Sequence, residues 1–547
     1  MQTCDIVPRP DKQANGDGED EHPHHTQHRS HLLFHHREQA VFSTKFCLNS
    51  LEFLGWGFPH LFSRNRGGLL VAHGSSEAAF PYQHGVSTRP LRGRMNLRSY
   101  RRKEAFTGGV VLGPEGEPMA SIRTWLEGTK TGGMSLGLKH TKQVLERLNL
   151  SHNPKHILHV AGSNGKGTVC ALMACGLTLA RRSNVFFSSP HLIRVEERIR
   201  VDGKPVSAHR FDEAMNAVRS ACETPPFVPL TFFEATYLAA MWVANDAGVE
   251  VVILETGLGG RLDATRSGPA TASLVTAISA EHQDILGESI ALIAREKAAI
   301  ARPGCPILMR NPEEKTVEQA MLEEAQMAGQ SELGEPQAPA APHIVNIPNG
   351  TSVRTEALIL ATALFNEVGL PSEHLAAAFE RVHWPARLQH VAEHSSNGHP
   401  FLLDAAHNPS GLQRVLPELE QHVRQAVEAG KGWTLVFGTS PQKNLASFCK
   451  PLIALATRYP PHQIVFTEPQ GGRYSGVACQ TLADLAWPFA ATHLEPLPQK
   501  ALKHLSSMAP SEVGLVISLG SLYLQGNILE ALDLSSDEDL SLLSKHS

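Results

Sequence analysis

The sequence predicts an α/β protein with a mostly parallel main sheet. Short apolar runs with the length of buried strands, such as residues 251–254, alternate with longer segments that have helical apolar spacing. This alternation is typical of strand–helix–strand units, which place parallel strands under a cover of helices. With 547 residues, of which 42% are hydrophobic, the chain is long enough for roughly two or three domains with sizeable cores.

Charge and cysteine usage exclude several classes of protein. The formal net charge of -5 is small for this length and does not indicate a nucleic-acid-binding surface. The eight cysteines are scattered without a C-x-x-C pair, so we expect neither a disulfide framework nor a zinc site, and we expect a reducing cytoplasm. Because no run of about eighteen apolar residues occurs, no membrane-spanning segment is predicted.

Residues 1–118 differ in composition from the rest of the chain. They contain seven closely placed histidines without fixed spacing and a run of six arginines. A metal-binding tail and a transit peptide are the alternatives, but the histidines lack ligand spacing and transit peptides avoid the acidic residues found upstream. We interpret residues 1–118 as a disordered extension or the product of an over-long gene assignment, with Met119 as a sensible start.

The first functional element is a glycine-rich turn between a predicted strand and a predicted helix, at residues 162–168. Glycines let backbone N–H groups approach an anion, and a helix N-terminus adds partial positive charge. Lys166 is placed for the terminal phosphates and Thr168 for a magnesium ion. The spacing departs from G-x-x-x-x-G-K-[ST], because Val160 stands at the first glycine and Gly167 separates lysine from threonine. We interpret the turn as a nucleotide-binding site rather than an ordinary turn.

Polar residues follow three further predicted strands. The strand that begins at residue 184 ends in serines, the strand at 251–254 ends at Glu255 before a glycine-rich loop, and His282 follows the strand at 272–278. The carboxyl ends of parallel strands share one edge of a sheet, where ligands bind. A carboxylate at this edge suits magnesium, so we expect Glu255 to be a metal ligand rather than a chance strand-end acid. His282 would face the same crevice, although a lone histidine is more often structural.

A helix is predicted to begin after Thr231, which is placed as its N-cap. Glu234 follows three residues later, as in an ordinary capping box. The residues leave this structural role and a ligand role for Glu234 open.

A second α/β unit follows in the C-terminal part of the chain. Residues 310–345 are linker-rich, and an apolar helix is predicted at 355–368. The strands predicted after it lie at residues 400–403, 433–437, 463–467 and 514–518. The expected organisation is a central domain, a smaller C-terminal α/β domain and a polar tail, at residues 119–385, 386–533 and 534–547.

Taken in order, these segments resemble the folylpolyglutamate synthase/dihydrofolate synthase family, the folate branch of the Mur-ligase-like amide ligases. The resemblance covers roughly residues 119–529. Each matching segment alone would be unspecific, but their order and spacing together are highly specific. The segments lie at residues 162–168, 188–192, 196–198, 230–234, 255–265, 296–298, 384–388 and 404–409.

The resemblance implies a Mur-ligase-like fold with a central P-loop ATPase domain, and an enzyme that forms a C–N bond. Its carboxylate substrate would be phosphorylated by ATP and then attacked by the amine of L-glutamate. That substrate would be dihydropteroate, the γ-carboxylate of a (tetrahydro)folate, or both, which defines dihydrofolate synthase and folylpolyglutamate synthase activities. The resemblance implies ATP, two Mg²⁺ ions, small-molecule substrates and a cytoplasmic monomer, without nucleic-acid or membrane partners.

The family's functional residues are matched position by position. Lys166, Lys297 and His407 match positions that the family uses in catalysis. Lys297 matches a lysine that is commonly carbamylated in the family, and the carbamate anion would support a second magnesium ion. The ATP contacts would be Ser163, Asn164, Gly165, Lys166, Gly167, Thr168, Arg387 and Asp404; the metal ligands Ser189, Glu255 and His282; and the pterin-binding residues Thr231, Phe232, Phe233, Glu234, Leu262, Asp263 and Ala264.

One segment departs from the family pattern. A His-Gln-x-x-Asn-Ala segment is usual near the end of the first domain, and here Val353 and Glu356 stand for its glutamine and asparagine near the nucleotide. Two alternatives therefore accompany the ligase hypothesis. A Mur-type ligase acting on a cell-wall precursor is disfavoured by the pterin-matching segments. A nucleotide- or folate-binding homologue with impaired turnover is suggested by Val353 and Glu356.

Overall fold

The computed structural model describes residues 121–132, 137–328, 338–392, 398–472, 474–488 and 491–543. All of them belong to one compact unit of the chain, Thr107–Ser547. The interpretation of residues 1–118 lies outside the described residues. So does the middle of the segment predicted to be linker-rich, and so do the last four residues.

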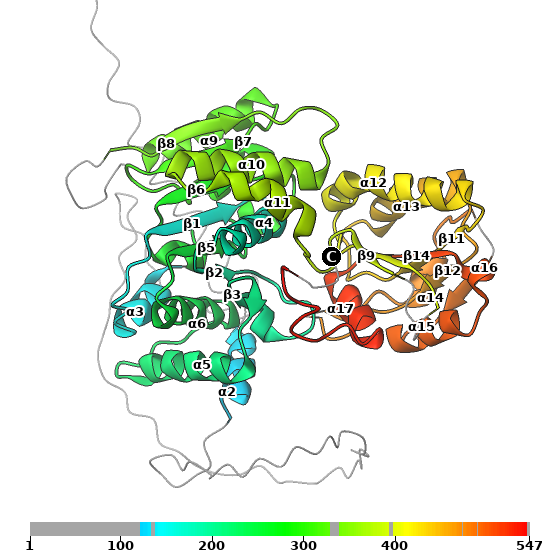
Figure 1. Cartoon of the computed structure of the whole chain (residues 1–547), viewed down its shortest axis with the longest axis horizontal. Coiled ribbons are helices and arrows are strands. Elements are labelled where there is room, and N and C mark those ends of the chain that lie inside the picture. Colours follow the sequence, from blue (N-terminus) through cyan, green and yellow to red (C-terminus); the bar gives the residue numbers. More distant parts are fainter. Residues whose placement is uncertain are drawn as a thin grey trace, which may run out of the picture. The chain divides into compact units, whose positions relative to one another are not determined.

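The first sheet has eight strands in the order β4-β3-β2-β5-β1-β6-β7-β8 (Figure 1). Six neighbouring strands are parallel, and the antiparallel pairings of this sheet are β2 with β3 and β3 with β4. This confirms the predicted mostly parallel sheet. The strands span His156–Ala161 (β1), Asn184–Phe187 (β2), Ile199–Val201 (β3), Lys204–Pro205 (β4), Val251–Glu255 (β5), Ala272–Val275 (β6), Pro306–Arg310 (β7) and Ala341–Val345 (β8).

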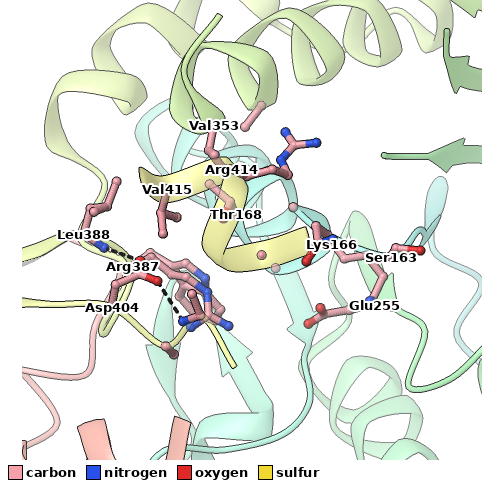
Figure 2. Close-up of a pocket in the computed structure, with 18 of the residues that line it drawn as sticks. Ser163, Lys166, Thr168, Glu255, Val353, Arg387, Leu388, Asp404, Arg414 and Val415 are labelled. Atoms are coloured by element: carbon pink, nitrogen blue, oxygen red, sulfur yellow. Dashed lines mark hydrogen bonds between the residues drawn. The ribbon is translucent and has the colours of Figure 1, made fainter. Parts of the chain in front are cut away.

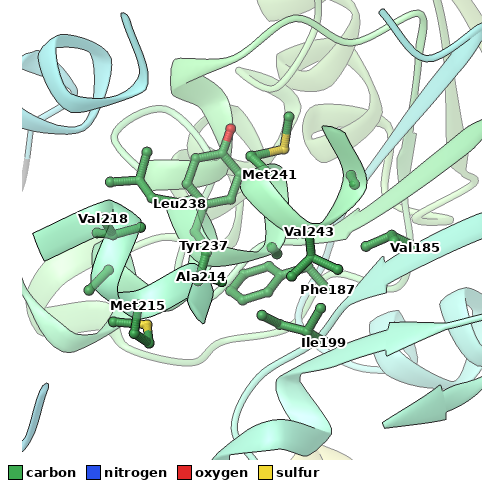
Figure 3. Close-up of a cluster of buried hydrophobic side chains, with 14 of the residues drawn as sticks. Val185, Phe187, Ile199, Ala214, Met215, Val218, Tyr237, Leu238, Met241 and Val243 are labelled. Carbon is green, nitrogen blue, oxygen red and sulfur yellow. The ribbon is translucent and has the colours of Figure 1, made fainter. Parts of the chain in front are cut away.

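Helices cover both faces of this sheet, which explains why its central strands are apolar throughout. On one face, Val185 and Phe187 of β2 pack against α5 and α6, as Figure 3 shows. Phe186, between them, points to the other face and packs with α4, α10 and α11. These helices span Lys166–Leu179 (α4), Ala208–Glu223 (α5), Phe232–Ala247 (α6), Val353–Val368 (α10) and Leu375–Arg381 (α11).

The segment predicted to be linker-rich, residues 310–345, contains regular structure where it is described. Helix α9 (Lys315–Met327) packs on the sheet through Val317 and Met321, and strand β8 pairs with β7. Pro342 within β8 is compatible with a strand because β8 lies at the edge of the sheet. Composition alone favoured a linker here because the β8 pairing depends on β7, not on local sequence.

The second sheet has six strands in the order β13-β12-β11-β14-β10-β9. The four strands predicted from sequence are confirmed as β10, β11, β12 and β14, and β9 is antiparallel to β10. The strands span Gln389–Val391 (β9), Phe401–Leu403 (β10), Trp433–Phe437 (β11), Ile464–Phe466 (β12), Thr492–Leu494 (β13) and Leu515–Leu519 (β14). The covering helices are α12 (Pro409–Glu428) and α13 (Leu445–Arg458) on one face, with α15 (Pro498–Ser506) and α17 (Leu522–Ala531) on the other.

After α17 the chain returns to the first sheet. Leu540 and Leu542 are fully buried, and Leu542 packs into the core beneath α4, α10 and α11. The backbone of Leu542 donates to the carbonyl of Gly203 at 2.9 Å and accepts from the amide of His383 at 2.8 Å. The predicted polar tail therefore also contains buried leucines. Among the described helices, none has the length and hydropathy needed to span a bilayer.

Candidate active site

A cavity of about 470 Å³ lies beside the glycine-rich turn and the start of α12 (Figure 2). Its walls come from the carboxyl ends of β1, β5 and β10 and from the helices that follow them. Every residue predicted to take part in the chemistry, in ATP binding or in metal binding lines this one cavity. These residues are Ser163, Asn164, Gly165, Lys166, Gly167, Thr168, Ser189, Glu255, His282, Lys297, Arg387, Asp404 and His407.

The glycine-rich turn is held in one conformation by its neighbours. A Cβ atom on Gly162 would lie 1.9 Å from Oγ1 of Thr276, so only glycine fits there. Gly165 caps α4 with a left-handed φ of 85°, which glycine adopts at no steric cost. The amide of Ser163 donates to the carbonyl of Ala277 at 2.8 Å. The turn therefore presents the unpaired amides of the α4 N-terminus to the cavity, ready for an anion.

Gly167, which breaks the standard spacing of the motif, permits close contacts between the turn and the matched segments at residues 384–388 and 255–265. A Cβ atom there would lie 3.2 Å from the indole of Trp384 and 3.5 Å from Oε1 of Glu255. The departure from the usual P-loop spacing thus has a packing reason. Lys166 begins α4, and its Nζ donates to the carbonyl of Gly162 at 2.9 Å.

Glu255 lies buried at the end of β5, as predicted. Its Oε2 accepts a 3.3 Å hydrogen bond from the amide of Ser189, and no ion pair to it occurs among the described residues. Burial raises the pKa of this carboxyl, opposed mainly by the charge of Lys166 and the Ser189 amide. A buried carboxylate without a paired cation is costly, so the site fits a divalent cation.

The predicted metal ligands do not form a closed cage. The described residues contain no group of three His, Cys, Asp or Glu side chains placed to hold a metal. His282 lies exposed at the cavity wall with a left-handed φ of 47°. This arrangement suits Mg²⁺, which keeps several waters and phosphate oxygens among its ligands.

Lys297 of α8 (Ile290–Ala298) is almost fully buried behind the turn. Its Nζ donates to the carbonyl of Gly162 and to Oε1 of Glu281, both at 2.9 Å. Burial and then the nearby charge of Lys166 lower the pKa of Lys297 to about 8. About half of such amines are neutral at pH 8, whereas an exposed lysine is almost entirely protonated.

The second α/β unit supplies the opposite wall. Buried Asp404, at the end of β10, accepts hydrogen bonds from the amides of Leu388 at 2.9 Å and Ala406 at 2.8 Å. Burial raises the pKa of Asp404, opposed first by the charge of Arg387. His407 is exposed to the cavity, and its Nδ1 lies 2.9 Å from the carbonyl of Ala405.

A hydrogen bond links the two α/β units at the glycine-rich turn. Asn164 Nδ2 in the glycine-rich turn donates to Oγ of Ser410, in the first turn of α12, at 2.9 Å. The glycine-rich turn is therefore in direct contact with the second α/β unit.

The residues predicted to bind the pterin do not line this cavity. Glu234 forms the capping box that the sequence allowed: Oε2 accepts from the amide and hydroxyl of Thr231, at 2.8 and 2.7 Å. Its Oε1 accepts from the hydroxyl of Thr141 at 2.8 Å, so both oxygens already have partners. The structural role of Glu234 is thus observed, and a ligand role stays a prediction.

The other predicted pterin residues surround the loop after β5. Asp263 Oδ2 accepts hydrogen bonds from the amides of Gly257 and Leu258, both at 2.9 Å, which fixes that loop. Phe233 packs so closely on Gly257 that a Cβ there would lie 2.6 Å from its ring. Two cations flank the neighbouring ring of Phe232, as Lys130 and Arg198 lie 4.8 and 4.9 Å from its centre. Of the remaining two residues, Ala264 is buried and Leu262 is exposed.

Apart from Val353, the sequence did not indicate the apolar part of the cavity or its charged neighbour Arg414. The apolar wall consists of Leu172, Val353, Ala357, Phe379, Val382, Leu388 and Val415. Arg414 belongs to α12, whose N-cap at Asn408 could be predicted, but no local signal shows which face of that helix meets α10.

Comparison with known proteins supports this assignment of the fold. No model of a protein family matches the chain. The dihydrofolate synthase/folylpolyglutamate synthase of Bacillus subtilis is 30% identical over 363 residues, which cover 61% of this chain and 82% of the relative. The protein of the same description from Escherichia coli is 40% identical over 198 residues, which cover 36% of this chain and 46% of the relative. The Haemophilus influenzae relative is likewise matched over 46% of its length.

Solved structures extend the similarity over most of the unit. E. coli FolC in complex with DHPP and ADP has a TM-score of 0.62 at 25% identity, covering 76% of this chain and 98% of that one. A bifunctional folylpolyglutamate synthase/dihydrofolate synthase with Mn, AMPPNP and L-glutamate bound also has a TM-score of 0.62 at 25% identity, covering 76% and 99%. Two α/β units around a glycine-rich turn therefore define a Mur-ligase-like protein. The chain belongs to the dihydrofolate synthase/folylpolyglutamate synthase family.

Proposed function

We propose that the protein is an ATP-dependent ligase that joins L-glutamate to dihydropteroate, to the γ-carboxylate of a folate, or to both. The observation that supports this most is the convergence of Lys166, Glu255 and Asp404 on one cavity from separate strand ends. The relatives named above are synthases of this kind, and one neighbour structure contains a divalent metal, an ATP analogue and L-glutamate.

Each group of residues would have a distinct task. ATP supplies a phosphoryl group that activates the substrate carboxylate, and the glutamate amine then displaces phosphate from the acyl carbon. Lys166 and the α4 amides would hold the terminal phosphates and neutralise charge that develops during transfer. Glu255, with Ser189 and His282, would hold Mg²⁺, while Arg387 and Asp404 would bind the nucleotide from the other wall. His407, exposed to the same cavity, would take part in the chemical step.

One assay separates this proposal from its alternatives. Purified protein would be incubated with ATP, Mg²⁺, L-glutamate and one of three substrates, which are dihydropteroate, tetrahydrofolate and a cell-wall precursor. ADP and the ligated product would be measured. Product with dihydropteroate or tetrahydrofolate supports the proposal and shows which activity is present. Product only with a cell-wall precursor would identify the Mur-type alternative, and nucleotide binding without any product would identify a homologue with impaired turnover.

Lys297 is expected to form a carbamate. Its lowered pKa leaves enough neutral amine near pH 8 to react with CO₂, and the resulting anion would support a second magnesium ion. We expect ¹³C-bicarbonate to give a carbamate NMR signal that increases between pH 7 and pH 9. The signal should be lost in Lys297→Arg and kept in a variant of the exposed Lys315. A spectrum unchanged by Lys297→Arg would contradict the assignment.

Deletion of residues 1–118 is expected to leave the activity within about twofold of the full chain, since all predicted site residues lie after residue 119. The ratio kcat/KM for ATP would be compared between the two proteins. A large decrease would show that the extension belongs to the enzyme.

A monomeric state and a cytoplasmic location are also proposed. Light scattering would test the first and cell fractionation the second.

A further inference from the structure

The segment after α17 forms a strap with a folded start and a buried end, at residues 536–543 (Figure 1, red). The amide and hydroxyl of Ser536 donate to Oδ2 of Asp539 at 3.0 and 2.5 Å, and the amide of Asp539 donates back to the Ser536 hydroxyl oxygen at 3.2 Å. This reciprocal cap fixes one turn of the chain. Leu540 and Leu542 follow the turn, and both side chains are fully buried.

One side of the strap is bound to the β3–β4 end of the first sheet. The amide of Leu542 donates to the carbonyl of Gly203, in the turn between β3 and β4, at 2.9 Å. Nη2 of Arg200 in β3 donates to the carbonyl of Leu540 at 3.4 Å. Arg200 is only 1% exposed, so its contact with the strap lies in the protein interior.

The other side of the strap holds His383, the first residue of the crossing segment (residues 383–388) that leads from α11 to β9. The amide of His383 donates to the carbonyl of Leu542 at 2.8 Å, and its Nε2 lies 3.0 Å from the carbonyl of Asp539. Burial lowers the pKa of His383, so the ring is neutral at neutral pH. Because a carbonyl only accepts, Nε2 carries the hydrogen and donates it. The strap thus holds His383 by its backbone and by its ring.

The crossing segment has a backbone that needs such support. Ala386 and Leu388 have left-handed φ angles of 57° and 48°, which residues other than glycine keep only where neighbouring groups fix them. The amide of Leu388 donates to Oδ2 of Asp404 at 2.9 Å, which fixes the end of the segment. The contacts of His383 with the strap fix its beginning. Arg387, the predicted ATP contact, lies between the two left-handed residues.

Trp384 connects the crossing segment to the glycine-rich turn. It follows His383 directly, and the guanidinium of Arg200 lies over its ring, 4.9 Å from the ring centre. Its indole lies so close to Gly167 that a Cβ atom there would be 3.2 Å from the ring. His383, Trp384 and Arg387 all line the cavity. The strap therefore reaches the site through two contacts, one with His383 and one with Arg200.

We propose that the strap positions the nucleotide site, because it holds the crossing segment so that Trp384 packs on the glycine-rich turn and Arg387 reaches ATP. His383 is a positioning residue, since its amide and Nε2 are both bound to the strap. The inference rests on the proposed function, because Arg387 matters only if the cavity binds ATP. It goes beyond that function by making a segment outside both sheets a requirement for tight nucleotide binding.

The test is equilibrium binding of the Mg²⁺ complex of AMPPNP to the full chain, together with amide hydrogen exchange of the crossing segment. Leu542→Asp places a charge in an apolar core and should release the strap. His383→Leu keeps every residue of the strap and removes the donor to Asp539. Each variant should raise the Kd by roughly tenfold or more, because a misplacement of about 1 Å at a site is costly. Exchange should become faster in the crossing segment and stay unchanged in β11.

Two further variants control this experiment. His383→Gln keeps a side-chain N–H donor and should bring the Kd to within about threefold of wild type, whereas leucine would be the better replacement if only packing mattered. Asp537→Asn removes the ion pair of the strap with Arg194, in which the aspartate is exposed, so the Kd should stay unchanged. Thermal unfolding would verify that each variant is folded. His383→Leu decides alone if Leu542→Asp does not fold.

The outcomes separate the inference from the proposed function. Binding by the wild type with an unchanged Kd in a folded Leu542→Asp or His383→Leu would overturn the inference alone. Equal Kd values for His383→Gln and His383→Leu would do the same. Failure of the wild type to bind AMPPNP would overturn the proposed function and the inference with it.

Discussion

Replacement of Lys166 by alanine is expected to reduce glutamate-dependent ADP formation below detection, by roughly 10²–10³-fold or more. The Nζ of Lys166 makes one hydrogen bond within the described residues, to the carbonyl of Gly162, and no ion pair. Its removal therefore costs the fold little, while the charge that develops on the phosphates loses its nearest cation. The measurement is kcat for ADP formation, together with the circular dichroism spectrum and Tm.

The matched control is Lys315→Ala, in the first turn of α9. Lys315 is exposed and, among the described residues, pairs only with Glu318 three residues later, so both activity and Tm should stay close to wild type. Full activity of Lys166→Ala with an unchanged Tm would contradict the assignment of the glycine-rich turn to phosphate binding.

Glu255→Gln should have two opposite effects. Loss of a metal ligand should lower turnover by about 10²-fold or more, because a neutral amide binds Mg²⁺ poorly. Without metal, however, the variant should be more stable than wild type at neutral pH. Burial raises the pKa of Glu255 above its ordinary value, so the folded protein holds this charge at a cost that the unfolded chain does not have.

Because the pKa of Glu255 is raised in the folded protein, the stability difference between Glu255→Gln and wild type depends on pH. A carboxyl whose folded pKa is raised favours the folded state at pH values below its ordinary pKa of 4.5, and this advantage is lost as the pH rises through the raised pKa. The Tm difference between variant and wild type should therefore vanish in acid and grow towards neutral pH. Added Mg²⁺ should raise the Tm of wild type and not that of Glu255→Gln. The surface variant Glu250→Gln should respond to Mg²⁺ as wild type does, and an equal response of Glu255→Gln would exclude Glu255 as a metal ligand.

Sequence reasoning succeeded where one local pattern had one physical meaning. The apolar runs of β1 and β5 are buried on both faces, so length and composition alone indicated strands of a parallel sheet. Strands of this kind bring their carboxyl ends to one edge, and for that reason the strand pattern alone predicts that Glu255 and the glycine-rich turn lie together. The same rule placed Asp404 at the end of β10.

It failed where pairing between distant segments decides the outcome. Strand β8 forms by pairing with β7, and Arg414 of α12 is held beside the cavity by its ion pair with Glu356 of α10. Neither contact is visible in a local stretch of sequence. Glu234 shows a third case. Its spacing from Thr231 fits a cap and a ligand equally well, and only the partners of its two oxygens show the capping box. The sequence shows that Glu356 differs from the family pattern. Only the structure shows that its Oε2 pairs with Arg310 and Arg414, at 3.2 and 2.9 Å.

The buried position of Leu542 has a consequence for how the protein is made. Its backbone partners, Gly203 and His383, belong to the first sheet and to the segment that precedes the second sheet. A ribosome delivers Leu542 only after every strand of both sheets has emerged, so a nascent chain that stops before residue 540 keeps an unfilled apolar site beneath α4 and α10. The core beneath α4 and α10 is therefore completed only after residues 540–542 have emerged, later than every strand of the second sheet.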